Sequence, residues 1–265
     1  SNIVYSEAAY DETSQRKKGQ LHNDQGYAAM LGDLDQSIAS LLQAYKALGL
    51  EKNTYLIFTS DNGGMPVLPM QVNKGKPYPV SLNAPLLRGK WDLTEGGIRV
   101  PFAMMGPEIE PNSQSDVPVV SFDILPTLAE LAGGNRLPDH LDGASIKPLL
   151  LTPDAEIQRS PAALVFHFPH YNRVGMNEPH SAIRMGDYTL IHFPVSGRRL
   201  LFNITQDIEE QLDLSKSEVE KADALQNRLD DYLSEVSAER PEQAYNWLTV
   251  GKSGEVKTQF FQRYK

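Results

Sequence analysis

The sequence predicts an α/β protein, in which a partial sheet with flanking helices is followed by a small antiparallel sheet and a C-terminal helix. Two patterns predict this architecture. A helical pattern over residues 27–45 leads into a short apolar strand at 54–59, and a helix beside a strand that is covered on both faces is typical of α/β folds. Beyond residue 161, four short strand patterns separated by turns indicate an antiparallel sheet.

The first helix is expected to bury one apolar face. Its apolar residues recur at intervals of three and four, and Gly49 follows the last turn as a candidate C-terminal cap. The strand at 54–59 is mostly apolar rather than alternating, so we expect neighbours on both of its faces. The expected apolar face of the helix comprises Tyr27, Met30, Leu31, Leu34, Ile38, Leu41, Leu42 and Tyr45.

A second short strand is expected at 100–105, and a second helix from about Asp123 to Ala132. Asp123 stands directly before the helical pattern, a position where an aspartate side chain commonly caps the first turn. Pro126 fits that first turn, because an N–H is not needed there for a helical hydrogen bond. Two consecutive glycines, Gly133 and Gly134, are expected to end the helix.

The chain is expected to divide near residue 150. Residues 134–161 contain four prolines and few periodic features, which is typical of a boundary. We therefore predict two parts, residues 1–150 as the α/β part and 151–265 as a small α+β part. The strands expected in the second part are 163–168, 181–185, 188–193 and 199–204.

The last helix is expected to start at Ser217. Glu220 follows three residues later, which is the spacing of a capping box. The expected buried face of this helix comprises Val219, Ala222, Leu225, Leu229, Tyr232, Leu233 and Val236.

The composition excludes several functional classes. Acidic residues outnumber basic ones by 34 to 25, which gives a formal net charge of −9 and argues against non-specific nucleic-acid binding. Cysteine is absent, so disulfides, thiolate metal sites and a cysteine nucleophile are excluded. No apolar run reaches the ~18 residues that a membrane-spanning helix requires, so we expect no membrane span.

The strand at 54–59 ends in two residues with oxygen donors, Asp61 and Asn62. Ligands of open α/β sheets commonly bind at the carboxyl ends of strands, and carboxylate and amide oxygens suit Ca²⁺ or Mg²⁺. The same residues are also ordinary turn formers, so an ordinary turn remains an alternative interpretation.

Two further groups of residues are candidates for ligand binding. Arg88 and Lys90 flank Gly89 in a loop that could bind an anion, although a surface loop with solvated cations is the alternative. His167 and His170 lie three apart at a strand end, and a zinc site there is not favoured because no third ligand is evident. We find no nucleophile motif such as Gly-x-Ser-x-Gly.

Several blocks together resemble the formylglycine-dependent sulfatases of the alkaline-phosphatase-like superfamily, in particular bacterial exported members. The resemblance extends roughly over residues 27–236 and keeps the family's order of blocks. The blocks are Phe58-Thr59-Ser60-Asp61-Asn62-Gly63, Asn83-Ala84-Pro85-Leu86 with Lys90, Glu95-Gly96-Gly97-Ile98-Arg99-Val100-Pro101, Asp123-Ile124-Leu125-Pro126-Thr127-Leu128, Leu141-Asp142-Gly143, Ser181-Ala182-Ile183-Arg184 with Gly186-Asp187-Tyr188, and Leu201-Phe202-Asn203-Ile204 with Asp207.

The resemblance implies roles for individual residues. Asp61 and Asn62 would be two ligands of a Ca²⁺ ion that also holds the substrate sulfate, and Lys90 would contact that sulfate. Weaker candidates for substrate binding are Arg88, His167, His170 and Arg184. The implied reaction is hydrolysis of a sulfate ester by a hydrated formylglycine, and the implied substrate is a sulfated small molecule or carbohydrate.

The chain also departs from the family pattern. The family's nucleophile derives from Cys or Ser in Cys/Ser-x-Pro-x-Arg, which is absent here, and the one Asp-Asp pair, Asp230-Asp231, lies in the C-terminal helix. We therefore expect the C-terminal portion of a sulfatase, inactive by itself, whose partner is the missing N-terminal half of the same protein. The resemblance implies a periplasmic or extracellular location.

Two alternatives remain. A phosphatase or phosphonate hydrolase of the same superfamily is one, although such members more often carry His at the position of Asn62. The other is a non-catalytic binding module that has kept the fold.

Overall fold

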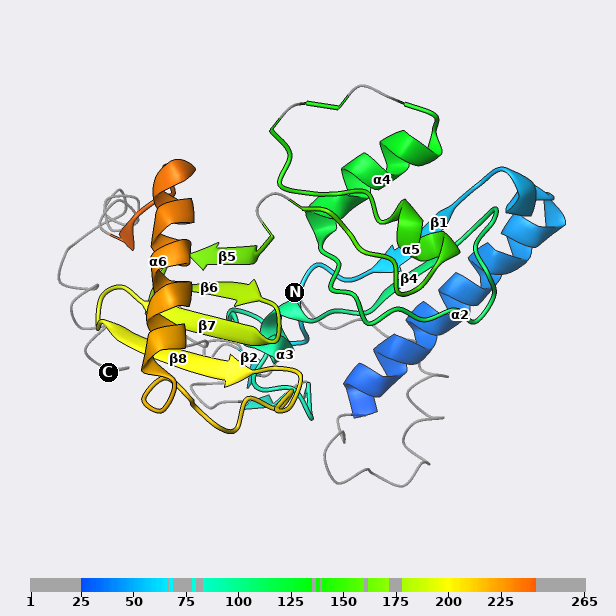
Figure 1. Cartoon of the computed structure of the whole chain (residues 1–265). Helices are drawn as coiled ribbons and strands as arrows, with labels where there is room; N and C mark the ends of the chain where they lie inside the picture. The colour runs from blue at the N-terminus through cyan, green and yellow to red at the C-terminus, as the bar shows by residue number, and fades with distance from the viewer. Residues whose placement is uncertain are drawn as a thin grey trace, which may run out of the picture. The chain divides into compact units, whose positions relative to one another are not determined.

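The chain has a mixed α/β fold and divides into two compact units (Figure 1). The computed structural model describes residues 25–65, 67–68, 78–79, 83–134, 137–138, 140–159, 162–171 and 178–241. The first unit consists of residues 1–40, 60–101 and 165–265, and the second of 41–59 and 102–164. Each unit therefore combines segments that are distant in sequence, whereas the division expected at residue 150 is continuous and stays a prediction.

The second unit contains a two-stranded antiparallel sheet, β1 (Leu56–Thr59) with β4 (Phe102–Met105). Phe58 lies opposite Ala103, and 42% of the Phe58 surface is exposed. The described residues therefore leave Phe58 partly uncovered, and the expected cover on both faces of this strand stays a prediction. Among the described residues this sheet has two strands, so each strand has a neighbour at one edge only.

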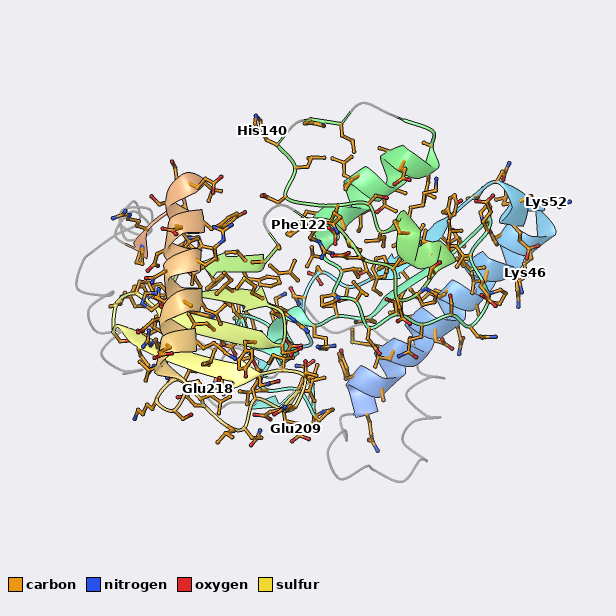
Figure 2. The ribbon with its side chains drawn as sticks, viewed as in Figure 1. Lys46, Lys52, Phe122, His140, Glu209 and Glu218 are labelled. Carbon is orange, nitrogen blue, oxygen red and sulfur yellow. The ribbon has the colours of Figure 1, made fainter. Side chains whose placement is uncertain are left out.

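Helix α2 (Gln25–Ala47) confirms the first predicted helix. Gly49 adopts the left-handed conformation with φ 66°, which confirms the predicted cap. Lys46 lies in the last turn, where a positive charge favours the helix dipole, and projects outward (Figure 2). The η1 turn (Leu50–Lys52) follows.

The predicted buried face of α2 is only partly confirmed. Leu31, Leu34 and Leu41 are 48–58% exposed, whereas Tyr45 is buried and its hydroxyl donates to the Thr54 carbonyl at 2.9 Å. Periodicity therefore predicted the helix correctly, but not how much of its apolar face is covered by the described residues.

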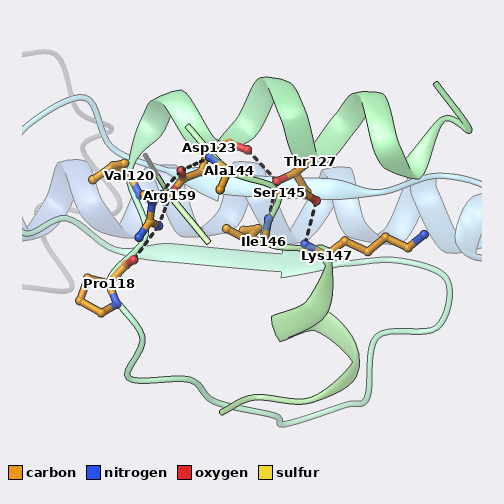
Figure 3. Close-up of polar contacts among 9 residues, drawn as sticks. All are labelled: Pro118, Val120, Asp123, Thr127, Ala144, Ser145, Ile146, Lys147 and Arg159. Atoms are coloured by element: carbon orange, nitrogen blue, oxygen red, sulfur yellow. Dashed lines mark hydrogen bonds and ion pairs between the residues drawn. The ribbon is translucent and has the colours of Figure 1, made fainter. Parts of the chain in front are cut away.

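Asp123 does not cap helix α4 (Ile124–Leu131) with its side chain, which corrects the prediction. It ends the η2 turn (Ser121–Asp123), and its carboxylate accepts hydrogen bonds from the Val120 and Ala144 N–H groups, both at 2.9 Å (Figure 3). It is also paired with Arg159. The carboxylate thus joins segments up to 36 residues away, because these donors compete with the helix N–H groups.

Thr127 continues this network. Its hydroxyl donates to the Asp123 carbonyl at 2.6 Å and accepts from the Ile146 N–H at 2.9 Å (Figure 3). Ile146 directly precedes helix α5 (Lys147–Leu151), so the network attaches α5 to α4.

A four-stranded sheet with the order β5-β6-β7-β8 dominates the first unit. The β6–β7 and β7–β8 pairs are antiparallel, and helix α6 (Val219–Glu235) lies across the sheet, packed against β6 and β7 (Figure 1). These elements confirm the predicted sheet with one covering helix. The strands are β5 (Leu164–Phe168), β6 (His180–Met185), β7 (Tyr188–Phe193) and β8 (Arg198–Asn203).

The core of the first unit lies on this sheet. Adjacent strand residues such as Leu190 and Ile191 point to opposite faces of a sheet, and both are buried, so both faces of this sheet are covered. One cluster of the core comprises Ala182, Ile191, Phe193, Phe202 and Ile204.

Helix α6 differs from the prediction at its start. It begins at Val219 without a side-chain capping bond, and the Ser217 hydroxyl donates instead to the Leu214 carbonyl at 3.2 Å. The predicted capping box is therefore wrong, because Ser217 serves the turn before the helix. Ala222, Leu225 and Leu229 are buried as predicted, while the two ends of the expected face, Val219 and Val236, are exposed.

The remaining elements of the first unit are short: α3 (Glu95–Ile98), β2 (Val67–Leu68) and β3 (Tyr78–Pro79). In the part of the chain that the structure describes, no helix has the length and apolarity to cross a membrane.

Candidate active site

Asp61 and Asn62 lie in the turn that follows β1. The Ser60 hydroxyl donates to the Asn62 carbonyl at 3.1 Å, and the Asn62 amide nitrogen donates to the Gly63 carbonyl at 2.9 Å. That bond leaves the amide oxygen of Asn62 available as an acceptor. Asp61 is exposed, and its carboxylate has no ion pair within the described ranges. The turn thus presents two oxygen donors side by side.

Three glycines bring this turn against the segment around α3 with no space for a side chain. The Gly63 N–H donates to the Gly97 carbonyl at 2.9 Å, and the Gly96 N–H to the Leu87 carbonyl at 3.0 Å. A Cβ atom on Gly63 would lie 1.7 Å from the Gly96 carbonyl oxygen, and one on Gly96 would lie 2.2 Å from that of Leu87. We call Gly63, Gly96 and Gly97 the glycine contact.

Residues 83–94, here called the Lys90 loop, are attached to the same turn. The Lys90 N–H donates to the Gly64 carbonyl at 3.1 Å. The side-chain amide of Asn83 accepts from the Gly64 N–H and donates to the Gly64 carbonyl, both at 2.9 Å, and donates to the Arg88 carbonyl at 2.8 Å. The structure therefore brings Lys90 to the segment that carries Asp61 and Asn62. Asn83 was not among the predicted site residues, although it opens the Asn83-Ala84-Pro85 block.

The two cations of the Lys90 loop differ in their surroundings. The Arg88 guanidinium is paired with the buried carboxylate of Asp92 at 2.7 Å. Lys90 is half-buried, and its ammonium lies 5.8 Å from the ring centre of Trp91. No acidic side chain within the described ranges is ion-paired with Lys90. Its charge therefore remains available to an anion, whereas that of Arg88 is balanced within the loop.

Arg184 on β6 faces the chain itself. Its guanidinium lies 3.4 Å from the Glu95 carboxylate. Burial lowers the pKa of Arg184 below its ordinary value, and the neighbouring Glu95 opposes that effect. A role of Arg184 in substrate binding stays a prediction.

The two histidines of the predicted set have different environments. The ring nitrogens of His167 lie 2.7 Å from the Ser181 hydroxyl and 2.7 Å from the Glu239 carbonyl. Since a carbonyl only accepts, the Nε2 atom of His167 carries a proton. The His170 ring packs edge-on against Phe168. Substrate roles for both stay predictions.

A pocket of about 570 Å³ lies beside His167, between the sheet and the C-terminal end of α6. Its polar lining includes Ser181, His192, Asp230 and Arg240. Asp61, Asn62 and Lys90 are not among the residues that line it.

The fit of a metal ion to this turn depends on the oxygen donors that the described residues supply. Among the described residues, no group of three or more His, Asp, Glu or Cys side chains could hold a metal ion. Ca²⁺ takes about 6–8 oxygen ligands, and Asp61 and Asn62 supply two oxygens of suitable chemistry. They therefore fit part of a Ca²⁺ site.

Comparisons with known proteins place these residues in context. The sulfatase family model matches residues 2–134, and the model for the C-terminal part of N-sulphoglucosamine sulphohydrolase matches residues 89–239. An ulvan-active sulfatase from Formosa agariphila is 32% identical over 217 residues, which cover 81% of this chain and 39% of that protein. Human steryl-sulfatase is 30% identical over 215 residues, covering 70% of this chain and 35% of that protein.

A solved structure is also similar to this chain. The crystal structure of Ps i-CgsB in complex with k-i-k-neocarrahexaose superposes with a TM-score of 0.66 at 26% identity, covering 88% of this chain and 47% of that one. The chain thus spans less than half the length of these relatives. The two family models together cover all the residues of the glycine contact, the Lys90 loop and the C-terminal sheet. The chain belongs to the sulfatase family of the alkaline-phosphatase-like superfamily.

Proposed function

We propose that this chain is the C-terminal part of a sulfatase that hydrolyses sulfate esters, and that Lys90 binds the sulfate group. The observation that supports this most is the hydrogen bond from the Lys90 N–H to Gly64, which holds the loop against the turn of Asp61 and Asn62. A half-buried ammonium whose charge is not balanced by a described acidic residue is suited to an anionic group. Because the loop holds the Lys90 ammonium in place before the reaction, that charge would stabilise the negative charge that develops on the sulfate or on the leaving oxygen.

Asp61 and Asn62 would hold Ca²⁺ as part of a larger ligand set. When bound, the ion would polarise the sulfate and help to orient it. The residues of this chain then have separate tasks. The carboxylate and amide oxygens anchor the metal side of the site, while Lys90 supplies positive charge on the sulfate.

The nucleophile is proposed to come from another part of the protein. This chain has no cysteine and no Ser-x-Pro-x-Arg, while a covalent mechanism requires an activated nucleophile. We therefore propose that residues 1–265 alone do not hydrolyse sulfate esters. The partner would be an N-terminal half of the same protein. The exposed leucines of α2 and the exposed Phe58 of β1 are apolar surfaces that such a partner would cover.

The substrate is proposed to be a sulfated small molecule or carbohydrate. This proposal is supported by the names of relatives, one an ulvan-active sulfatase and one crystallised with a neocarrahexaose. The bacterial relatives also support a periplasmic or extracellular location.

Assays of two proteins test the function. The purified chain and the complete gene product are given a chromogenic sulfate ester and the matching phosphate ester, with Ca²⁺. We expect no turnover by the chain, and sulfate turnover by the complete protein that falls about 10²–10³-fold in Lys90→Ala. Lys52→Ala, on an exposed lysine, is the matched control.

Three outcomes would overturn the proposal. Turnover by the chain alone that disappears in Lys90→Ala would mean that it contains a nucleophile. Preference of the complete protein for the phosphate ester would identify a phosphatase. Inactivity on both esters would favour a binding module.

A further inference from the structure

Two buried carboxyl groups meet at the start of α3. Glu95 is the first residue of that helix and is 1% exposed, and Glu210, in the loop after β8, is 4% exposed. The Glu210 carboxyl accepts a hydrogen bond from the Glu95 N–H at 2.9 Å, across 115 residues of sequence. The neighbouring Glu209 is exposed and points outward (Figure 2). Burial therefore distinguishes two adjacent, chemically identical side chains.

Among the described residues, the cations that form ion pairs with these two glutamates both pair with Glu95. Arg99 and Arg184 both form ion pairs with the Glu95 carboxylate. Glu210 has no ion pair with a described residue, and its second oxygen, Oε1, has no hydrogen-bond partner among them. An ionised Glu210 would be a second buried negative charge beside Glu95, which is costly without a counter-charge. The arrangement therefore favours a neutral Glu210.

The charges that face Glu210 agree with this assignment. Burial raises the pKa of Glu210 to about 8, and the carboxylates of Glu95 and Asp207 act in the same direction. The hydrogen bond from the Glu95 N–H and the charge of Arg99 act against it. The guanidinium of Arg184, on β6, forms its ion pair with Glu95 rather than with Glu210. Glu210 is thus protonated in the folded protein at neutral pH.

The start of α3 is directly connected to the candidate active site. The first N–H groups of a helix have no partner within it, and that of Glu95 is satisfied by Glu210. The adjoining Thr94 hydroxyl donates to the Leu87 carbonyl at 2.8 Å. Gly96 and Gly97, which follow Glu95, belong to the glycine contact. A displacement of Glu95 would therefore move both the Lys90 loop and the contact with Gly63.

We propose that Glu210 is a positioning residue, a neutral carboxylic acid that fixes the start of α3 and thereby holds the Lys90 loop against the turn of Asp61 and Asn62. The importance of that loop for sulfate binding rests on the proposed function. The attachment of the start of α3 by Glu210 does not depend on it. Ionisation of Glu210 places a second negative charge beside Glu95 and loosens the loop. The local structure around Lys90 is therefore expected to change as pH rises through about 8.

Trp91, next to Lys90, is a reporter inside this loop. The chain has two tryptophans, Trp91 and Trp247, so Trp247→Phe leaves Trp91 as the only one. Its emission and its quenching by acrylamide are measured between pH 6.8 and 9.5. His180 does not interfere, because burial lowers its pKa below 6.5 and it titrates outside this range.

We expect a transition near pH 8 in the Trp247→Phe background. It should persist when Glu209→Gln is added and disappear with Glu210→Gln, which keeps an acceptor for the Glu95 N–H but cannot ionise. Circular dichroism confirms that the variants are folded. A transition that survives Glu210→Gln, or none in the background protein, would overturn the proposal.

A second measurement covers the case in which Glu210→Gln does not fold. Hydrogen exchange of the Glu95 amide is followed in the unmutated chain at pH 6.5 and 9, each corrected for the intrinsic rate. We expect the protection of the Glu95 amide from exchange to fall at least tenfold at the higher pH. Unchanged protection would refute the proposal that neutral Glu210 fixes the start of α3. Neither readout requires activity, so a failed sulfate assay would overturn the proposed function and leave this inference intact.

Discussion

Replacing Gly63 by alanine tests whether the glycine contact assembles the candidate site. The added Cβ atom would lie 1.7 Å from the Gly96 carbonyl oxygen and 2.8 Å from its carbon. Both of these are backbone atoms, so no side chain can rotate away to make space. The segment around α3 would have to retreat by more than about 1 Å to restore normal van der Waals contact.

That retreat has a cost that can be worked out from the structure. It breaks the hydrogen bond from the Gly63 N–H to Gly97 and strains the one from Gly96 to Leu87. Each buried backbone group left without a partner costs about 1–3 kcal/mol. We therefore expect Gly63→Ala to lower the free energy of unfolding by about 3 kcal/mol or more, roughly the two bonds together.

Urea unfolding followed by circular dichroism measures this loss. The matched control is Gly186→Ala in the β6–β7 turn, where φ is +57° and nothing lies within 4 Å of the added Cβ. That change meets only the conformational penalty of the left-handed region, about 1–2 kcal/mol. Equal destabilisation by the two variants would refute the reasoning, because the contact at Gly63 would then tolerate a methyl group.

Three more changes have expected outcomes. Folding raises the pKa of Glu210 from 4.5 to about 8, so its contribution to stability is complete below pH 4.5 and is lost as the pH rises to 8, at ~1.4 kcal/mol per pH unit. In urea unfolding across this range, Glu210→Gln should lack that slope, and an unchanged slope would exclude Glu210 as its source. Asp123→Ala leaves the Arg159 guanidinium, whose side chain is 11% exposed, without its carboxylate partner, and it should lower the free energy of unfolding by about 3–5 kcal/mol in the same assay. A loss below about 1 kcal/mol would instead show that Arg159 relaxes to solvent. Leu229→Ala removes a side chain that is 0% exposed and should cost about 2–5 kcal/mol, against about 0.5 kcal/mol or less for the control Leu212→Ala at 63% exposure.

Local patterns were sufficient for the C-terminal sheet. The strands expected at 163–168 and 188–193 are found at Leu164–Phe168 and Tyr188–Phe193, because strand-forming residues and the turns that separate them are neighbours in sequence. The long helix α2 and its left-handed cap at Gly49 were predictable for the same reason.

Capping was predicted less well, because competition for hydrogen bonds decides it. Asp123 stands at the expected position before α4, but its carboxylate accepts from Val120, Ala144 and Arg159. Ser217 likewise bonds to the preceding turn rather than to α6. A sequence pattern identifies a side chain that can cap a helix. It does not reveal which of the competing donors or acceptors forms the hydrogen bond with that side chain in the folded protein.

By itself, the sequence indicated the family and the helices and strands that have local patterns, and it identified Asp61, Asn62 and Lys90 as candidate site residues, whose roles stay predictions. Only the tertiary structure decided that Phe58 of β1 is exposed, that Gly63 has no space for a methyl group, and that Glu210 binds the Glu95 backbone. The physical reason is distance along the chain. Periodicity and propensity act over a few residues, whereas exposure, close backbone approach and the charge state of a buried carboxyl depend on segments that meet only when the chain folds.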